Sequence, residues 1–209
     1  MLEIKNVKVY DLKESVIACR NAMRLEMPDY TDEEFEKSLI RAKKLVRGSR
    51  ESDTVKCHDN FLTGIRVSFD VKYPGYWTPE FQRYHFADIV TSSSKMHRLT
   101  KMNMETCFNE YVTDESKTLM TKLVDDYNIA VASKDPDETY KAWMRVISNC
   151  PMGIELFMRV STNYKQLQTI YFQRKNHKLK EDWGEVCKMI ESLPYSKELI
   201  LGELDGTEN

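Results

Sequence analysis

IELFMRVSTNYKQLQTIYFQRKNH, residues 154–177, joins a strand pattern directly to a helix pattern. Residues 154–160 predict a strand, and Ser-Thr-Asn at 161–163 offers a cap for a helix over 164–175. Within that helix Asn163, Leu167, Ile170 and Arg174 are spaced by four, three and four residues, so they share one face. An apolar stripe that ends in an amide and a guanidinium is a candidate ligand-binding face.

Spacing alone leaves two interpretations of this face open. Arg174 could bind a phosphate or a pyrimidine carbonyl through two parallel hydrogen bonds, with His177 reaching the same region from the loop that follows. Alternatively, Asn163 only caps the helix, and Arg174 complements the helix dipole in the last turn.

Further strands and helices are predicted on the N-terminal side of this segment. Residues 3–10 alternate as a strand, residues 13–25 have mixed helical spacing, and Thr31-Asp-Glu-Glu is a capping box for a helix to about residue 46. Residues 61–73, FLTGIRVSFDVKY, alternate strictly and predict a second strand that Pro74-Gly75 ends. Thr78 and Pro79 then predict a helix that continues through FQRYHFADIV and ends near residues 91–94.

Helices are also predicted over residues 114–132 and 137–148, and a last amphipathic helix contains Trp183 and Ile190. Residues 203–209 are acidic and are expected to form a disordered tail. Long helices around a few strands predict an α+β fold, and 209 residues suit one domain.

Composition excludes several classes of function. The 31 basic and 33 acidic residues nearly balance, so we expect neither a nucleic acid polymer nor a membrane as partner. With 7 glycines and no GxGxxG or GxxxxGK[ST] motif, a nucleotide site has to be built from side chains. Five widely spaced cysteines and four scattered histidines predict free thiols, a cytoplasmic protein and no metal site.

A second polar constellation follows the predicted helix after Pro79. Gln82 and His85 precede a Ser-rich turn at 91–94, and the basic residues Lys95, His97 and Arg98 come next. Hydroxyl groups and cations together suit an anion pocket. The alternative is that the serines end the helix and His85 packs in the core. The sequence assigns no partner to Glu80.

These segments, taken in order, resemble the flavin-dependent thymidylate synthases over roughly residues 14–195. The matching pieces are SVIACRNAM (15–23), TDEEFEKSLIRAKKL (31–45), HDNF (58–61), GIRVSFDVKYP (64–74) and the TNYK motif at 162–165 with Arg174 and His177. The family's RHR triplet is replaced by His85-Phe86-Ala87, and Ile147 stands where the family has an arginine, with Arg145 two residues earlier. The resemblance implies a single domain over 1–209 with long helices around a small, mainly antiparallel sheet.

The resemblance also implies a site and a reaction. It assigns FAD binding to residues spread along the chain: His58, Gln82, His85, Asn163, Lys165, Thr169 and His177. It assigns the nucleotide dUMP, or a relative, to Ser94, Lys95, His97, Arg98, Arg145 and Arg174, with Arg174 as the catalytic residue. The implied enzyme is a homotetramer that uses NADPH and methylenetetrahydrofolate as co-substrates and transfers a one-carbon unit to C5 of a deoxyuridylate. The alternatives are a nucleotide-binding or assembly protein without turnover, and a structural protein.

Overall fold

A four-stranded sheet with the order β1-β2-β4-β3 forms the centre of the molecule, for which the computed structural model describes residues 2–51 and 58–202. Its strands are β1 (Glu3–Tyr10), β2 (Arg66–Pro74), β3 (Asp88–Ser92) and β4 (Glu155–Asn163). Each strand is antiparallel to its neighbours. The predicted α+β fold with a small antiparallel sheet is therefore confirmed.

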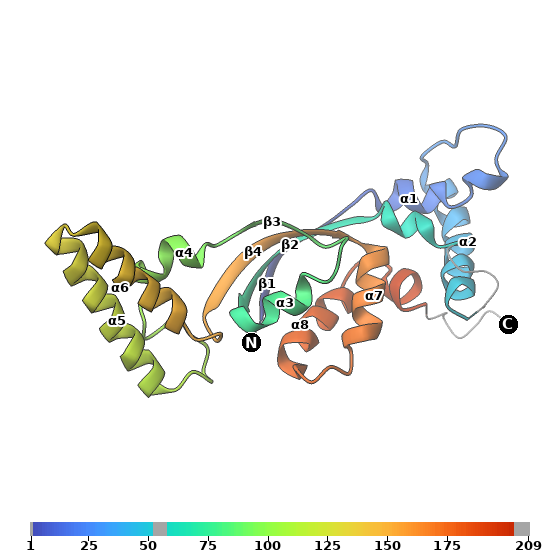
Figure 1. Cartoon of the computed structure of the whole chain (residues 1–209). Coiled ribbons are helices and arrows are strands. Elements are labelled where there is room, and N and C mark those ends of the chain that lie inside the picture. Colours follow the sequence, from blue (N-terminus) through green and yellow to red (C-terminus); the bar gives the residue numbers. More distant parts are fainter. Residues whose placement is uncertain (1, 52–57, 203–209) are drawn as a thin grey trace.

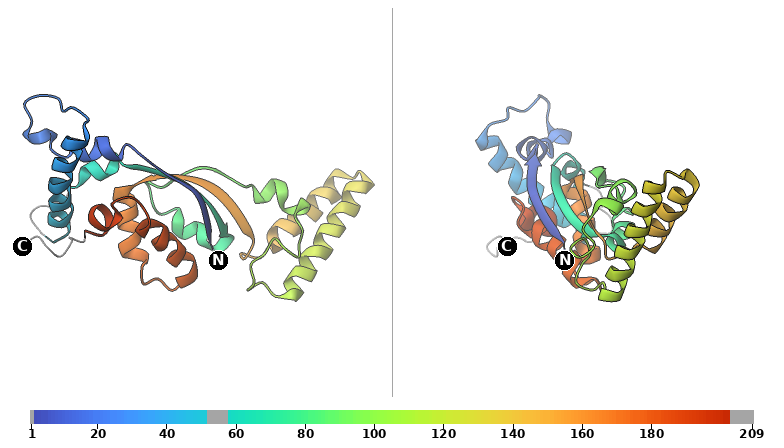
Figure 2. Two further views of the ribbon diagram at one scale, coloured as in Figure 1. Left: turned by 180° about the vertical axis from the view of Figure 1, so that it is seen from behind. Right: turned by 90° about the vertical axis from the view of Figure 1, so that its left-hand side faces the viewer.

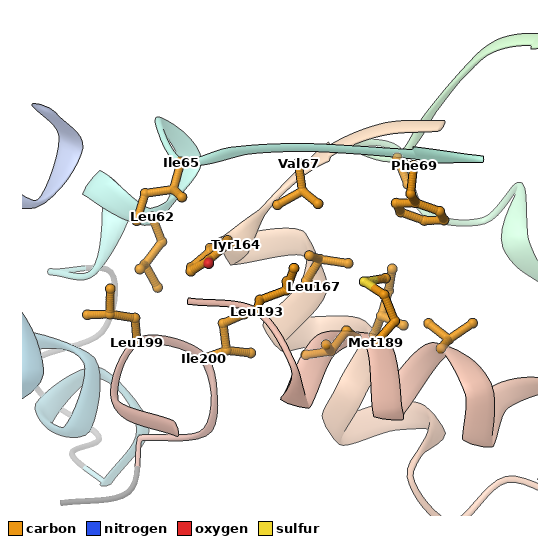
Figure 3. Close-up of a cluster of buried hydrophobic side chains, with 14 of the residues drawn as sticks. Leu62, Ile65, Val67, Phe69, Tyr164, Leu167, Met189, Leu193, Leu199 and Ile200 are labelled. Carbon is orange, nitrogen blue, oxygen red and sulfur yellow. The ribbon is translucent and has the colours of Figure 1, made fainter. Parts of the chain in front are cut away.

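Three helices cover one face of this sheet: α3 (Thr78–Phe81), α7 (Tyr164–Arg174) and α8 (Lys180–Glu191), as Figure 1 shows. Successive strand residues point to opposite faces, so alternate residues such as Val67, Phe69 and Val160 are buried against these helices. In Figure 3, Val67 and Phe69 of β2 point toward Leu167 of α7 and Met189 of α8. This layer is the main hydrophobic core.

The opposite face of the sheet carries none of the described helices (Figures 1 and 2). The residues that alternate with the core positions point to this face, and among them are Asp70, Lys72, Phe157 and Arg159. Except for Phe157 these side chains are charged, as expected of a sheet face that meets water. We call it the open face.

Helices lie at both ends of the sheet and make the molecule elongated (Figures 1 and 2). At one end are α1 (Leu12–Ala18) and α2 (Asp32–Glu51), and at the other end α5 (Asp114–Ser133) and α6 (Pro136–Asn149) form a hairpin. The hairpin packs against the segment 99–108 and Ile154 in a second hydrophobic cluster, and Leu156 of β4 packs against both clusters. The remaining elements are short: η1 (Asn21–Met23), η2 (Asn60–Thr63), η3 (Gly75–Trp77), α4 (Lys95–Arg98), η4 (Leu99–Lys101) and the π-helix η5 (Lys197–Leu201).

Most of the predicted elements are present with shifted ends. The α7 helix begins directly after β4, and Oδ1 of Asn163 accepts a hydrogen bond from the backbone N–H of Gln166 at 2.9 Å, as the predicted cap requires. Thr31 caps α2 through the N–H of Glu34, but the Glu34 side chain pairs with Arg20 and Arg24 instead of completing the capping box. The predicted tail, 203–209, lies outside the described residues.

Two predictions of local structure were wrong. The helix expected from Thr78 to about residue 90 ends at Phe81, because residues 88–92 form β3 and pair with β4. The β-branched run Ile89-Val90-Thr91 favours a strand once a partner strand is available. The strand expected from Phe61 begins at Arg66, because residues 60–63 form a 3-10 turn beside the buried Asp59.

None of the described helices combines the length and apolar character needed to cross a bilayer. Cys19, Cys107, Cys150 and Cys187 are free thiols, and Cys57 lies outside the described residues. Among the residues described, no three His, Cys, Asp or Glu side chains gather as metal ligands would.

Candidate functional site

A cleft of about 630 Å³ lies on the open face of the sheet. Residues from all four strands line it, together with the Ser-rich segment 91–94 and Arg98 of α4. We call it the sheet cleft. Its volume is in the range of small-molecule sites in proteins.

Arg159 is fixed near the centre of the sheet cleft. Its Nη1 donates to Oδ1 of Asp70 at 3.1 Å and to the backbone carbonyl of Asn6 at 3.2 Å, and Nδ2 of Asn6 donates to Oδ2 of Asp70 at 2.6 Å. The hydrogen bond from Asn6 and the nearby charge of Arg159 hold the pKa of Asp70 below its ordinary value. Nε and Nη2 of Arg159 have no hydrogen-bond partner among the described residues, so these donors are available to a ligand.

The Ser-rich segment is held at the edge of the cleft by specific hydrogen bonds. The backbone N–H of Ser93 donates to the carbonyl of Phe157 at 2.8 Å, and Oγ of Ser93 accepts from the N–H of Phe157 at 3.0 Å. Oγ of Ser94 caps α4 by accepting from the N–H of His97. Arg98 lines the cleft as Arg159 does, and the other charged residues of its lining are Lys5, Lys72, Glu3 and Asp70. Four basic and two acidic residues thus stand beside several hydroxyl groups.

Arg174 lies elsewhere, in a cluster between α3, α7 and α8. Its Nε donates to the hydroxyl of Tyr84 at 2.6 Å, and its Nη1 lies 3.2 Å from Oε2 of Glu80. The guanidinium also stacks on the ring of Trp183, 4.5 Å from its centroid. Because the side chain is 13% exposed and has these partners, it is a packed ion-pair residue in this chain.

Glu80 connects the predicted catalytic residue with His177. Its Oε2 accepts from Nε1 of Trp183 at 2.8 Å and lies 3.6 Å from Nε2 of His177. Nδ1 of His177 accepts from the N–H of Leu179, so the ring is held on both sides. Burial raises the pKa of Tyr84 above its ordinary value, and the hydrogen bond from Arg174 offsets only part of this shift.

A third cluster joins η2 to α7. Nζ of Lys165 lies 2.5 Å from Oδ2 of the fully buried Asp59 and 3.2 Å from Oε1 of Gln168. Oδ1 of Asp59 is buried without a hydrogen-bond partner among the described residues. Thr169 donates to the carbonyl of Lys165 on the exposed side of the helix.

The predicted site residues thus fall into separate groups in this chain. Ser94 and Arg98 line the sheet cleft, whereas Lys95 and His97 do not, and Arg145 is exposed on α6. Of the predicted FAD residues, His58, Gln82 and His85 are exposed, so the alternative that placed His85 in the core was wrong. The described residues that line a cavity with His58 include none of the other predicted FAD residues, and Asn163 and Lys165 form hydrogen bonds with neighbouring residues of the chain.

Sequence reasoning missed Arg159, Asp70 and Glu80. Arg159 could have been found from the strand pattern, because it alternates with Met158 and Val160 and so had to face away from the core. Glu80 left no such signal, since its partner Arg174 is 94 residues away.

No protein-family model matches the sequence, and no curated protein matches it. Its structure is similar to that of the flavin-dependent thymidylate synthase ThyX from Helicobacter pylori, solved in complex with FAD and dUMP. That likeness has a TM-score of 0.61 at 14% identity and covers 95% of this chain and 97% of the other. The UMP/dUMP methylase PolB from Streptomyces cacaoi, bound with 5-Br dUMP, matches with a TM-score of 0.57 at 13% identity, over 97% and 93% of the two chains. The chain therefore has the fold of the flavin-dependent thymidylate synthases, as a divergent example of it.

Proposed function

We propose that the protein transfers a one-carbon unit to C5 of a deoxyuridylate, with dUMP or a close relative as substrate and bound flavin as the redox cofactor. The observation that carries the proposal is the sheet cleft, which presents Arg98, Arg159 and the hydroxyl-rich segment 91–94 on a fold shared over almost the whole chain with two nucleotide-bound structures.

The cleft suits the phosphate end of a mononucleotide. A guanidinium forms paired hydrogen bonds with phosphate oxygens, and serine hydroxyls add further donors. Asp70 offsets part of the charge of Arg159 and keeps its Nη1 in place, so the remaining donors point to a defined position. Arg98 and the segment 91–94 take over the role of the family's RHR triplet, which this sequence lacks.

The flavin would be held between protomers in a homotetramer. His58, Gln82 and His85 are exposed and have polar groups to offer, and α7 supplies Thr169 beside them in the proposed assembly. Exposed apolar side chains on the helices support self-association, among them Ile129, Tyr140 and Met144. Reduced FAD supplies a hydride in such a reaction, with NADPH and methylenetetrahydrofolate as co-substrates.

A second candidate is a nucleotide-binding protein without turnover. The ion pair between Arg174 and Glu80 favours it, because an arginine committed to a carboxylate and to the hydroxyl of Tyr84 is less available to polarise a pyrimidine carbonyl. The sheet cleft would still bind the nucleotide in this case.

Two measurements test the proposal. Purified protein incubated with FAD and then desalted should keep the absorption bands of bound flavin, and calorimetry should detect binding of dUMP. Arg159→Gln should weaken dUMP binding about tenfold or more, while Lys122→Gln, an equal charge change on α5, should leave it unchanged. Protein that binds dUMP but never retains flavin supports the second candidate, and protein that binds neither overturns both.

A further inference from the structure

Asn6 interrupts strand β1 where this strand borders the sheet cleft. Lys5 lies opposite Asp70 of β2 and Lys8 lies opposite Ser68, so two residues of β1 face a single residue of β2, which is a β-bulge. Asn6 has a φ of 53°, in the left-handed region. A bulge with a left-handed residue usually has glycine there, because a side chain is strained in that conformation. The backbone therefore favours glycine at this position, and the amide side chain has to be explained by what it contacts.

Asn6 contacts both members of the ion pair in the cleft. Its side-chain Nδ2 donates to Oδ2 of Asp70 at 2.6 Å, and its backbone carbonyl accepts from Nη1 of Arg159 at 3.2 Å. Arg159 belongs to β4, and β2 lies between β1 and β4. Carbonyls of a regular antiparallel strand lie close to the plane of the sheet and bond to the adjacent strand. The bulge therefore turns the carbonyl of Asn6 toward the open face, where it reaches Arg159.

These contacts decide which edge of the Arg159 guanidinium is free. A guanidinium has two edges that can form paired hydrogen bonds, Nη1 with Nη2 and Nε with Nη2. Asn6 and Asp70 occupy Nη1, whereas Nε and Nη2 have no partner among the described residues. The two parallel donors of the Nε–Nη2 edge match two oxygens of a phosphoryl group. The Arg159 side chain is 27% exposed, so a ligand in the cleft can reach it.

The lysines of the cleft do not offer the same chemistry. Lys5 is paired with Glu3, and Lys72 is paired with Glu155. Lysine also lacks the planar pair of donors that fixes the orientation of a phosphoryl group. Among the described strand residues that line the cleft, Arg159 is thus the one that can form paired hydrogen bonds with a phosphoryl group.

We infer that Asn6 is a positioning residue, which sets the orientation of Arg159 and turns its Nε–Nη2 edge toward a phosphoryl group in the sheet cleft. This role deepens the proposed function, and it rests on that function where the phosphoryl group is that of dUMP. Asn6 acts through Arg159 and needs no contact with the nucleotide. Its contribution to binding should therefore appear only for ligands that carry a phosphate.

NMR titration of the full chain with dUMP, and with deoxyuridine, which lacks the phosphate, measures this contribution. Asn6→Gly removes the amide but keeps the left-handed backbone that glycine adopts readily, so β1 should keep its bulge. The affinity for dUMP should fall about fivefold or more, because the group that orients the guanidinium is lost. The affinity for deoxyuridine should stay the same.

Two further variants separate the amide from the backbone. Asn6→Asp keeps the size of the side chain but places a carboxylate beside that of Asp70, so it should lower the affinity for dUMP at least as much as Asn6→Gly. Asp11→Gly is the matched control, because Asp11 also has a left-handed φ, of 57°, and its side chain forms no capping hydrogen bond. This control should leave both affinities unchanged.

The Nε–H resonance of Arg159 reports the orientation of the side chain directly, and Arg159→Lys identifies it by its loss. In the unmodified chain its heteronuclear NOE should be that of a rigid group, and the resonance should shift when inorganic phosphate is added. Asn6→Gly should lower the NOE and reduce the shift, whereas a purely structural role of Asn6 in β1 would change neither.

The outcomes distinguish this role from the proposed function. An unchanged NOE together with unchanged dUMP affinity in Asn6→Gly overturns the inference. An equal loss of affinity for dUMP and deoxyuridine also overturns it, because Asn6 would then only stabilise the strand. If the unmodified chain binds no dUMP, the proposed function fails, and the response of Arg159 to inorganic phosphate alone decides whether Asn6 positions it.

Discussion

The carboxylate of Glu80 lies 3.2 Å from Nη1 of Arg174 and holds that guanidinium against the ring of Trp183. Removing the Arg174 side chain would leave the partly buried carboxylate of Glu80 without its partner, which is costly. The contact of the guanidinium with the aromatic ring would be lost as well. We therefore expect Arg174→Ala to lower the free energy of unfolding by about 2–4 kcal/mol.

Urea unfolding measures this loss, with Lys175→Ala as the neighbouring control. Lys175 is exposed, and its removal should cost less than about 0.5 kcal/mol. A loss that small for Arg174→Ala, accompanied by loss of nucleotide binding, would show that Arg174 binds ligand and does not stabilise the protomer.

Asp59→Asn should destabilise the protein by about 2–3 kcal/mol, because Asp59 is fully buried and its Oδ2 lies 2.5 Å from Nζ of Lys165. The same chemical change in Glu33→Gln removes an exposed pair with Lys37 and should cost much less, because water screens that pair. Chemical denaturation of the two variants compares them directly. Equal costs would mean that the buried pair contributes no more than a surface pair.

Gly153→Ala should destabilise the fold by about 1–3 kcal/mol. A Cβ at this position would collide with the side chain of Val112 and lie 2.7 Å from Oδ1 of the buried Asn109. Gly184→Ala is the matched control, since its Cβ would meet nothing within 4 Å and alanine favours the interior of α8. Thermal unfolding should show a lower midpoint for the first variant and an equal or higher one for the second. The opposite order would contradict the packing around Asn109.

The ionised Asp70 of the sheet cleft should make part of the free energy of unfolding depend on pH in acid. In the folded state its pKa is lowered from the ordinary value of an aspartate, first by the hydrogen bond from Asn6 and then by Arg159. A lowered folded pKa gives stability that is present above about pH 4 and is lost as the pH falls through the folded value. The difference in unfolding free energy between the unmodified chain and Asp70→Asn should therefore be constant near neutral pH and shrink below about pH 4. A difference that does not change with pH would mean that Asp70 is not stabilised in its ionised form.

The sequence predicted those parts of the fold that depend on local periodicity. The strand that leads into α7, the Asn163 cap and the α5–α6 hairpin all follow from apolar spacing and capping residues close together in the chain. The β3 strand could not be found this way, because it is fixed by pairing with β4, which is about 70 residues away. Local spacing there favours a helix equally well.

The candidate site was only partly predictable for the same reason. Ser94 and Arg98 were found because they stand in one short polar segment, whereas Arg159 became part of the sheet cleft through the face on which its strand presents it. The partner of Arg174 depends on how α3 packs against α7, which no local pattern encodes. The predicted FAD residues lie apart in this chain for the same reason, because the packing of its helices and strands, which no local pattern encodes, decides where they lie.

Release of tritium from C5 of labelled dUMP tests the central claim most directly, in protein reconstituted with FAD and supplied with NADPH and methylenetetrahydrofolate. We predict release above background by the unmodified chain and loss of that release in Arg98→Gln, which removes a cation of the sheet cleft. Background release from flavin-loaded protein that binds dUMP would contradict one-carbon transfer to this nucleotide.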